Sequence, residues 1–164
     1  VRKWHPGQDW VWEPGGFGVC DPGINALSIF TKIMPFPVFV ESARLTFPAN
    51  RQTPVEVEIA FKSGQLHQPE LSAGFNWLEE SGEVWTIRVE TGTGDTIRLE
   101  GGGRSLTIND ELVLKHGDGE YAAMYDHFAG LLERHESDVD AAPLRLMSDV
   151  FLMGARVNGP EFEW

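Results

Sequence analysis

Cysteine and long apolar runs are what this chain has least of. Cys20 is the single cysteine among 164 residues, so an intrachain disulfide and the disulfide framework of a small secreted domain are both excluded. No stretch reaches the roughly 20 apolar residues that a membrane-spanning helix needs, and the first residues lack the apolar segment of a signal peptide. These absences predict a soluble, cytoplasmic protein without a membrane partner.

Basic residues are scarce as well. The chain has 13 Lys and Arg against 25 Asp and Glu, a net charge of -12. Negative charge in such excess repels phosphate backbones, so we expect no nucleic-acid partner. Its histidines are scattered and none has the spacing of metal ligands to another, so we expect no metal site; they are His5, His67, His116, His127 and His135.

The order of helical and strand patterns predicts an α+β fold. Asp21 followed by Pro22 indicates a helix start with Asp21 as N-cap, and the apolar residues that follow predict a largely buried helix over 22–34. Alternating apolar residues then predict strands, with 71–78 and 84–90 joined as a hairpin. Strand-like segments lie at 38–40, 43–47, 55–61, 71–78, 84–90, 96–99, 105–108 and 111–114, and two further helices are expected over 119–134 and 141–156.

Helix, strands and two helices in that order predict one open, mainly antiparallel sheet of six or seven strands with helices covering one face. No boundary divides the chain, so residues 1–164 are expected to form a single domain. The other face of the sheet would then meet solvent or a partner.

The segment from Trp4 to Leu27 carries a family resemblance. Its Gly-rich turn, Gly15 to Gly18, precedes Asp-Pro-Gly-Ile-Asn at residues 21–25. This resembles the start of the carboxy-terminal domain in the glucose-fructose oxidoreductase and inositol dehydrogenase (Gfo/Idh/MocA) superfamily, which has Asp-x-Gly-x-His there. Asn25 in place of that His, together with residues 137–154, is similar to the branch of aldose (galactose, arabinose or xylose) 1-dehydrogenases.

Members of this superfamily also have an amino-terminal Rossmann domain with a Gly-rich nucleotide loop and a Glu-Lys-Pro motif that supplies a catalytic lysine. Neither motif is present in this chain, which we therefore interpret as a fragment. The resemblance implies the carboxy-terminal, substrate-binding half of a dehydrogenase that uses NAD or NADP, bound mainly by the absent domain. It would oxidise the anomeric carbon of an aldopyranose such as galactose or arabinose to a lactone, and the fragment alone would be inactive.

Asp21 and Asn25 are the expected catalytic residues. They are four residues apart at the start of one helix, so both side chains project from the same face. The resemblance implies that Asp21 orients the sugar and the lysine of the other half, and that Asn25 binds the reacting or adjacent hydroxyl. Taken without the resemblance, Asp21 is explained as well by helix capping.

Trp4, His5 and Trp77 are the expected substrate-binding residues. Trp4 and His5 match positions that line the sugar in similar enzymes, where an indole stacks on the pyranose and the His donates a hydrogen bond; a boundary aromatic and a surface His are the alternatives. Trp77 would close the site, although Trp77 and Trp85 could instead form a cross-strand pair that stabilises the hairpin. Cys20 lies in an apolar run and is expected to be buried and inert.

The sequence also allows two other functions. Some members of the superfamily are transcriptional regulators that keep the fold and the nucleotide site without turnover, so the chain could belong to a non-catalytic sensor. It could also serve only as a dimerisation domain. Members usually form dimers or tetramers through the sheet, so the resemblance implies a homo-oligomer through the uncovered sheet face.

Overall fold

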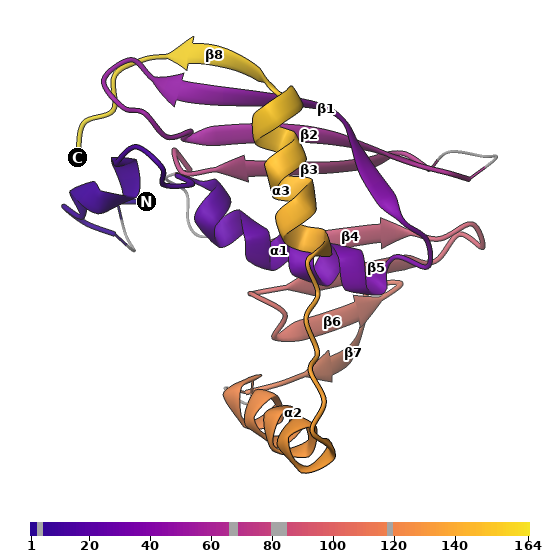
Figure 1. Ribbon diagram of the computed structural model, residues 1–164. Coiled ribbons are helices and arrows are strands. Elements are labelled where there is room, and N and C mark those ends of the chain that lie inside the picture. The colour runs from indigo at the N-terminus through magenta and orange to yellow at the C-terminus, as the bar shows by residue number, and fades with distance from the viewer. Residues whose placement is uncertain (3–4, 66–68, 80–84, 118–119) are drawn as a thin grey trace. The chain divides into compact units, whose positions relative to one another are not determined.

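The computed structural model describes the chain apart from residues 3–4, 66–68, 80–84 and 118–119 (Figure 1). The chain divides into two compact units, the first made of residues 1–80 and 141–164 and the second of residues 81–140. Each unit is described by itself.

The first unit contains a four-stranded sheet in the order β3-β2-β1-β8 (Figure 1). β1 (Val38–Pro48), β2 (Glu56–Ser63) and β3 (Leu71–Asn76) are antiparallel neighbours, whereas β8 (Ala155–Gly159) runs parallel to β1. Alternation along the strands puts Leu45 opposite Val57 on a buried face and Arg44 opposite Glu58 on an exposed one. The alternation of apolar and polar residues in the sequence therefore predicted correctly which face of the sheet is buried and which is exposed.

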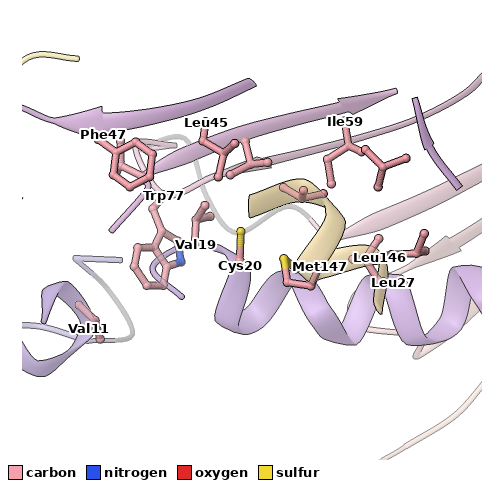
Figure 2. Close-up of a cluster of buried hydrophobic side chains, with 14 of the residues drawn as sticks. Val11, Val19, Cys20, Leu27, Leu45, Phe47, Ile59, Trp77, Leu146 and Met147 are labelled. Atoms are coloured by element: carbon pink, nitrogen blue, oxygen red, sulfur yellow. The ribbon is translucent and has the colours of Figure 1, made fainter. Parts of the chain in front are cut away.

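Two helices cover the apolar face of this sheet, α1 (Cys20–Ile33) and α3 (Ala142–Met153). Leu27 of α1 and Met147 of α3 are each 1% exposed and pack in one cluster with Leu45 and Ile59 of the sheet (Figure 2). Burial of a side chain of this size stabilises the fold by about 1.5–3 kcal/mol. The unit thus has the helix-on-sheet core that was predicted.

The start of α1 differs from the prediction. The helix begins at Cys20, and the N-cap position is occupied by Val19, with no side-chain capping bond. Asp21 lies inside the first turn, so its expected role as N-cap is wrong. The reason is the turn before the helix: Gly18 has a φ of 56°, and the Val19 N–H donates to the Pro54 carbonyl oxygen at 2.9 Å.

The C-terminal end of the chain forms structure that was not predicted. α3 ends at Met153, and the chain continues directly into β8 instead of extending the helix to residue 156. Beyond β8, Phe162 is 2% exposed, and Trp164 Nε1 donates to Asp9 Oδ1 at 3.0 Å. The tail therefore packs on the 3-10 helix η1 (Asp9–Trp12), and the two ends of the chain meet.

The second unit contains a separate antiparallel meander and one helix. β4 (Thr86–Glu90), β5 (Thr96–Glu100), β6 (Ser105–Ile108) and β7 (Glu111–Lys115) pair in that order, and α2 (Glu120–Arg134) follows. The expected single sheet is thus corrected to two four-stranded sheets within the described residues.

The expected hairpin between 71–78 and 84–90 is also wrong, because β3 pairs with β2 and β4 pairs with β5. The α+β class with open, mainly antiparallel sheets is confirmed.

Candidate functional site

The glycine-rich turn before α1 is fixed by the loop that leads into β2. A Cβ on Gly18 would lie 2.9 Å from Pro54 N and closer still to the Pro54 carbonyl oxygen, so only glycine allows the two backbones to approach this closely. The buried Thr53 hydroxyl donates to the Val11 carbonyl oxygen at 3.0 Å and ties the same loop to η1. The turn, and with it the start of α1, is therefore held from two sides.

Asp21 and Asn25 are brought to one face of α1, as predicted, and both are exposed. Neither side chain has a hydrogen-bond partner among the residues that the structure describes. Gly23, between them, is buried, and a Cβ there would be 2.8 Å from the ring of Phe75 on β3. The close contact at Gly23 packs α1 against the sheet, while the Asp21 carboxylate and the Asn25 amide remain exposed to solvent.

His5 and Trp77 also come together, at a ring-centroid distance of 6.0 Å. Trp77, however, is only 9% exposed and lies within the buried apolar cluster (Figure 2). Its ring packs edge-to-face on Trp12, with ring centroids 5.5 Å apart. The exposed aromatic next to His5 is Trp10, which is 53% exposed, with ring centroids 5.7 Å apart. Trp4 lies outside the described residues.

Sequence reasoning missed Trp10 and its neighbour Gln8. Both stand in the Trp-rich segment that carries the family resemblance, so their position in that segment was the available signal. In the structure, Gln8 Oε1 is 3.2 Å from His5 Nδ1 and 2.9 Å from Trp10 Nε1. His5, Gln8 and Trp10 therefore form one hydrogen-bonded group at the partly exposed edge of the first unit.

The alternative for Trp77, a cross-strand pair with Trp85, is not formed in the described residues. Trp77 directly follows β3 in the first sheet, whereas Trp85 directly precedes β4 in the second. A cross-strand pair needs two neighbouring strands of one sheet, and these strands are not neighbours.

Cys20 is buried, as expected, with 1% of its surface exposed. Burial raises the pKa of its thiol to about 12 because the thiolate would be poorly solvated. Within the described ranges, no group of three or more His, Cys, Asp or Glu is placed to hold a metal ion. The same ranges contain no helix with the length and apolar character to cross a membrane.

The open face of the first sheet is shallowly hollowed over β1, β2 and β3. The hollow has a volume of about 450 Å³, and its polar and small lining residues are Ser42, Arg44, Glu58, Ala60, Ser72 and Gly74. These side chains alternate with the buried residues that face α1 and α3. The hollow is therefore on the opposite face of the sheet from the helix that carries Asp21 and Asn25.

Comparison with known proteins gives a consistent set of relatives. No family model matches the chain. It is 46% identical over 162 residues to galactose 1-dehydrogenase from Pseudomonas fluorescens, a match that covers 99% of this chain and 52% of that protein. The crystal structure of D-galactose-1-dehydrogenase from Rhizobium etli matches with a TM-score of 0.93 and 42% identity, over 99% of this chain and 51% of that one.

A 3-ketoreductase from Actinomadura kijaniata, solved in complex with TDP-benzene and NADP, has a TM-score of 0.69 at 15% identity and covers 90% of this chain and 51% of its own. That likeness concerns the fold alone. The chain spans about half the length of the curated relative and of the solved structures it matches. It is homologous to galactose 1-dehydrogenases over nearly its whole length, which confirms the resemblance drawn from the sequence.

Proposed function

We propose that this chain is the carboxy-terminal, substrate-binding half of an NAD(P)-dependent sugar dehydrogenase that oxidises the anomeric carbon of an aldopyranose to a lactone. Galactose is the first candidate substrate because the Pseudomonas fluorescens and Rhizobium etli relatives, at 46% and 42% identity, are galactose dehydrogenases. The observation that carries the proposal is the pair Asp21 and Asn25, exposed and without partners among the described residues on one face of α1. A cytoplasmic location is part of the same proposal.

The described residues do not themselves fit a dinucleotide. A phosphate-binding glycine loop joins a strand to a helix in a βαβ unit, whereas Gly101 to Gly103 joins the antiparallel strands β5 and β6. We therefore assign NAD(P) to the other half of the protein. The 164-residue chain alone should neither oxidise sugars nor bind the dinucleotide, and saturable binding of NAD(P) at micromolar concentration in calorimetry would contradict this.

In the proposed reaction this chain positions the sugar. The carboxylate of Asp21 accepts hydrogen bonds from a sugar hydroxyl and from a lysine of the other half, which holds that lysine where it can take the proton of the anomeric hydroxyl. The amide of Asn25, one helical turn further on, binds the reacting or adjacent hydroxyl. His5 and Trp4 line the sugar, and Trp77, which is buried, supports His5 from the core.

The test uses the protein in which this chain is joined to its amino-terminal half. Asp21→Asn should lower kcat on the order of a hundredfold or more, while the free energy of unfolding changes by about 0.5 kcal/mol or less, because the carboxylate makes no capping bond. Asn25→Ala should lower kcat less, because a neutral hydrogen bond is weaker than a charged one. Ser28→Ala, on the next turn of α1, is the matched control and should leave kcat unchanged.

Rates on galactose, arabinose, xylose and glucose should be measured beside thermal melts of the same proteins. A near-normal kcat for Asp21→Asn contradicts the proposed site. So does a loss of activity that only follows the loss of stability, because Asp21 would then act through the fold alone.

We also propose that the protein self-associates through the open face of its first sheet. Arg44 lies opposite Glu58 in the β1–β2 register, so a two-fold axis through this face can set the Arg44 of each copy against the Glu58 of the other. Small residues at Ala60, Ser72 and Gly74 let the copies approach closely. A stable contact of this kind buries about 800 Å² per subunit.

Sedimentation velocity tests this contact. Arg44→Glu should dissociate the oligomer, because Glu would then face Glu, and the double exchange Arg44→Glu with Glu58→Arg should restore it. An unmodified protein that is monomeric at high micromolar concentration contradicts the proposal.

A further inference from the structure

The Gln8 side-chain oxygen lies within hydrogen-bond distance of two ring nitrogens, one from Trp10 and one from His5. This Oε1 atom is 2.9 Å from Trp10 Nε1 and 3.2 Å from His5 Nδ1. An indole N–H can only donate a hydrogen bond, so the amide atom that faces it must be the oxygen and not the NH₂ group. Trp10 therefore fixes the orientation of the Gln8 amide.

The orientation of that amide decides where His5 carries its hydrogen. A carbonyl oxygen can only accept, so His5 Nδ1 must be the donor to Gln8 Oε1. A neutral imidazole has one N–H, which leaves His5 Nε2 as an unprotonated acceptor.

The ring of His5 is also held in place. It packs edge-to-face on Trp10, with an interplanar angle of 87°, and lies tilted against the buried Trp77. The backbone N–H groups of His5 and Gln8 donate to the carbonyl oxygens of Val1 and His5 at 2.8 and 3.1 Å. The side chain is partly exposed, and in the described part of the chain nothing forms a hydrogen bond with Nε2.

We propose that Gln8 and Trp10 are positioning residues that set the tautomer of His5, so that His5 Nε2 accepts a hydrogen bond from a hydroxyl of the bound sugar. The proposal rests on the proposed function, because it assigns His5 to the sugar site. It reverses the expected direction of this hydrogen bond, because neutral His5 accepts it from the sugar and does not donate it. The position then favours a hydroxyl over a carbonyl or carboxylate oxygen, which has only lone pairs to offer.

The tautomer can be measured directly by ¹H–¹⁵N NMR of histidine side chains in the protein that contains both halves, with His5 assigned by its loss in His5→Ala. The unmodified protein should show the hydrogen of neutral His5 on Nδ1. Gln8→Leu removes the acceptor and should lower the ratio of the Nδ1–H to the Nε2–H tautomer about tenfold, the change expected for the loss of one hydrogen bond. Gln8→Glu keeps an oxygen acceptor and should retain the Nδ1–H tautomer.

Two further variants separate this network from a general disturbance. Trp10→Phe keeps an aromatic ring but frees the Gln8 amide to turn, so the tautomer ratio should fall as in Gln8→Leu. Gln52→Leu makes the same substitution at an exposed glutamine elsewhere in the first unit and should leave His5 unchanged. A hydrogen on Nε2 in the unmodified protein, or a ratio that Gln8→Leu does not alter, overturns the proposal whether or not the protein is a dehydrogenase.

The contact with the sugar has its own readout. Saturating galactose should shift the Nε2 resonance of His5, and Gln8→Leu should weaken galactose binding by about three- to tenfold with kcat little changed. Among monodeoxy galactoses, the one that lacks the contacting hydroxyl should bind Gln8→Leu and the unmodified protein equally. If galactose leaves Nε2 unshifted, or every deoxy sugar is as sensitive to Gln8→Leu as galactose is, the acceptor role of His5 is refuted.

Discussion

Gly18 and Gly15 make a sharp test of how the turn before α1 is held. Both have a left-handed backbone conformation, with φ values of 56° and 89°. They differ in their surroundings: a Cβ on Gly15 would meet nothing within 4 Å, whereas a Cβ on Gly18 would press against the backbone of Pro54. Alanine at the two positions therefore separates the cost of the conformation from the cost of the close approach.

The expected magnitudes follow from these contacts. An L-residue in the left-handed region costs about 1 kcal/mol more than glycine, so Gly15→Ala should lower the free energy of unfolding by about that amount. Gly18→Ala has the same cost and must also push the two backbones apart, which strains or breaks the buried hydrogen bond from Val19 N–H to the Pro54 carbonyl oxygen. The loss of a buried bond adds about 1–3 kcal/mol, so we expect about 3 kcal/mol in total.

Urea unfolding followed by tryptophan fluorescence is a suitable assay, because Trp12 and Trp77 are buried in the first unit. Gly18→Ala should lower the urea midpoint by roughly 1–2 M and Gly15→Ala by roughly 0.5 M. Equal losses at the two positions would refute the close approach as the reason for glycine at position 18.

Three further outcomes are expected. Burial raises the pKa of Cys20 from 9.0 to about 12, so between these pH values the thiol ionises in the unfolded chain but not in the folded one. The free energy of unfolding should therefore keep the full contribution of Cys20 below pH 9 and lose it as the pH rises from about 9 to about 12. Urea titrations of Cys20→Ala should lack this dependence. Gly23→Ala should cost about 1–3 kcal/mol by overpacking against Phe75, and Phe75→Leu should recover part of that loss in thermal melts. Asn109 donates to Asp95 at 2.8 Å and lowers the pKa of that carboxyl, so Asn109→Gly should return the pKa toward its ordinary range in carboxyl ¹³C NMR.

The regular elements were predictable because their determinants are local. Alternation of Leu45, Val57 and Ile59 with polar neighbours follows from the period of two in a strand, and it identified both the strands and their buried face. The spacing of four between Asp21 and Asn25 likewise placed both on one face of α1. Each of these inferences depends only on residues within a few positions of one another.

Pairings between distant segments were decided by the tertiary structure. Nothing in residues 71–90 indicates that β3 pairs with β2 and β4 with β5, because each strand selects its neighbour from segments that can lie far apart in the chain. β8 is fixed in the same way, by its parallel pairing with β1. The exact start of α1 depends on Pro54, some 35 residues further along. Its carbonyl oxygen accepts a hydrogen bond from Val19 N–H, and Val19, not Asp21, occupies the N-cap position.

At the candidate site, the Trp-rich segment and the pair at the start of α1 could be read from the sequence, but which of these side chains a ligand can reach depends on how the chain packs. Trp77 and Trp10 are equally apolar in the sequence, but Trp77 packs on Trp12 in the core while Trp10 stays exposed beside His5. The tautomer of His5 depends on three side chains meeting with donor and acceptor in fixed positions. A hydrogen bond requires a suitable angle as well as a suitable distance, and only the folded chain places the donor and the acceptor with both.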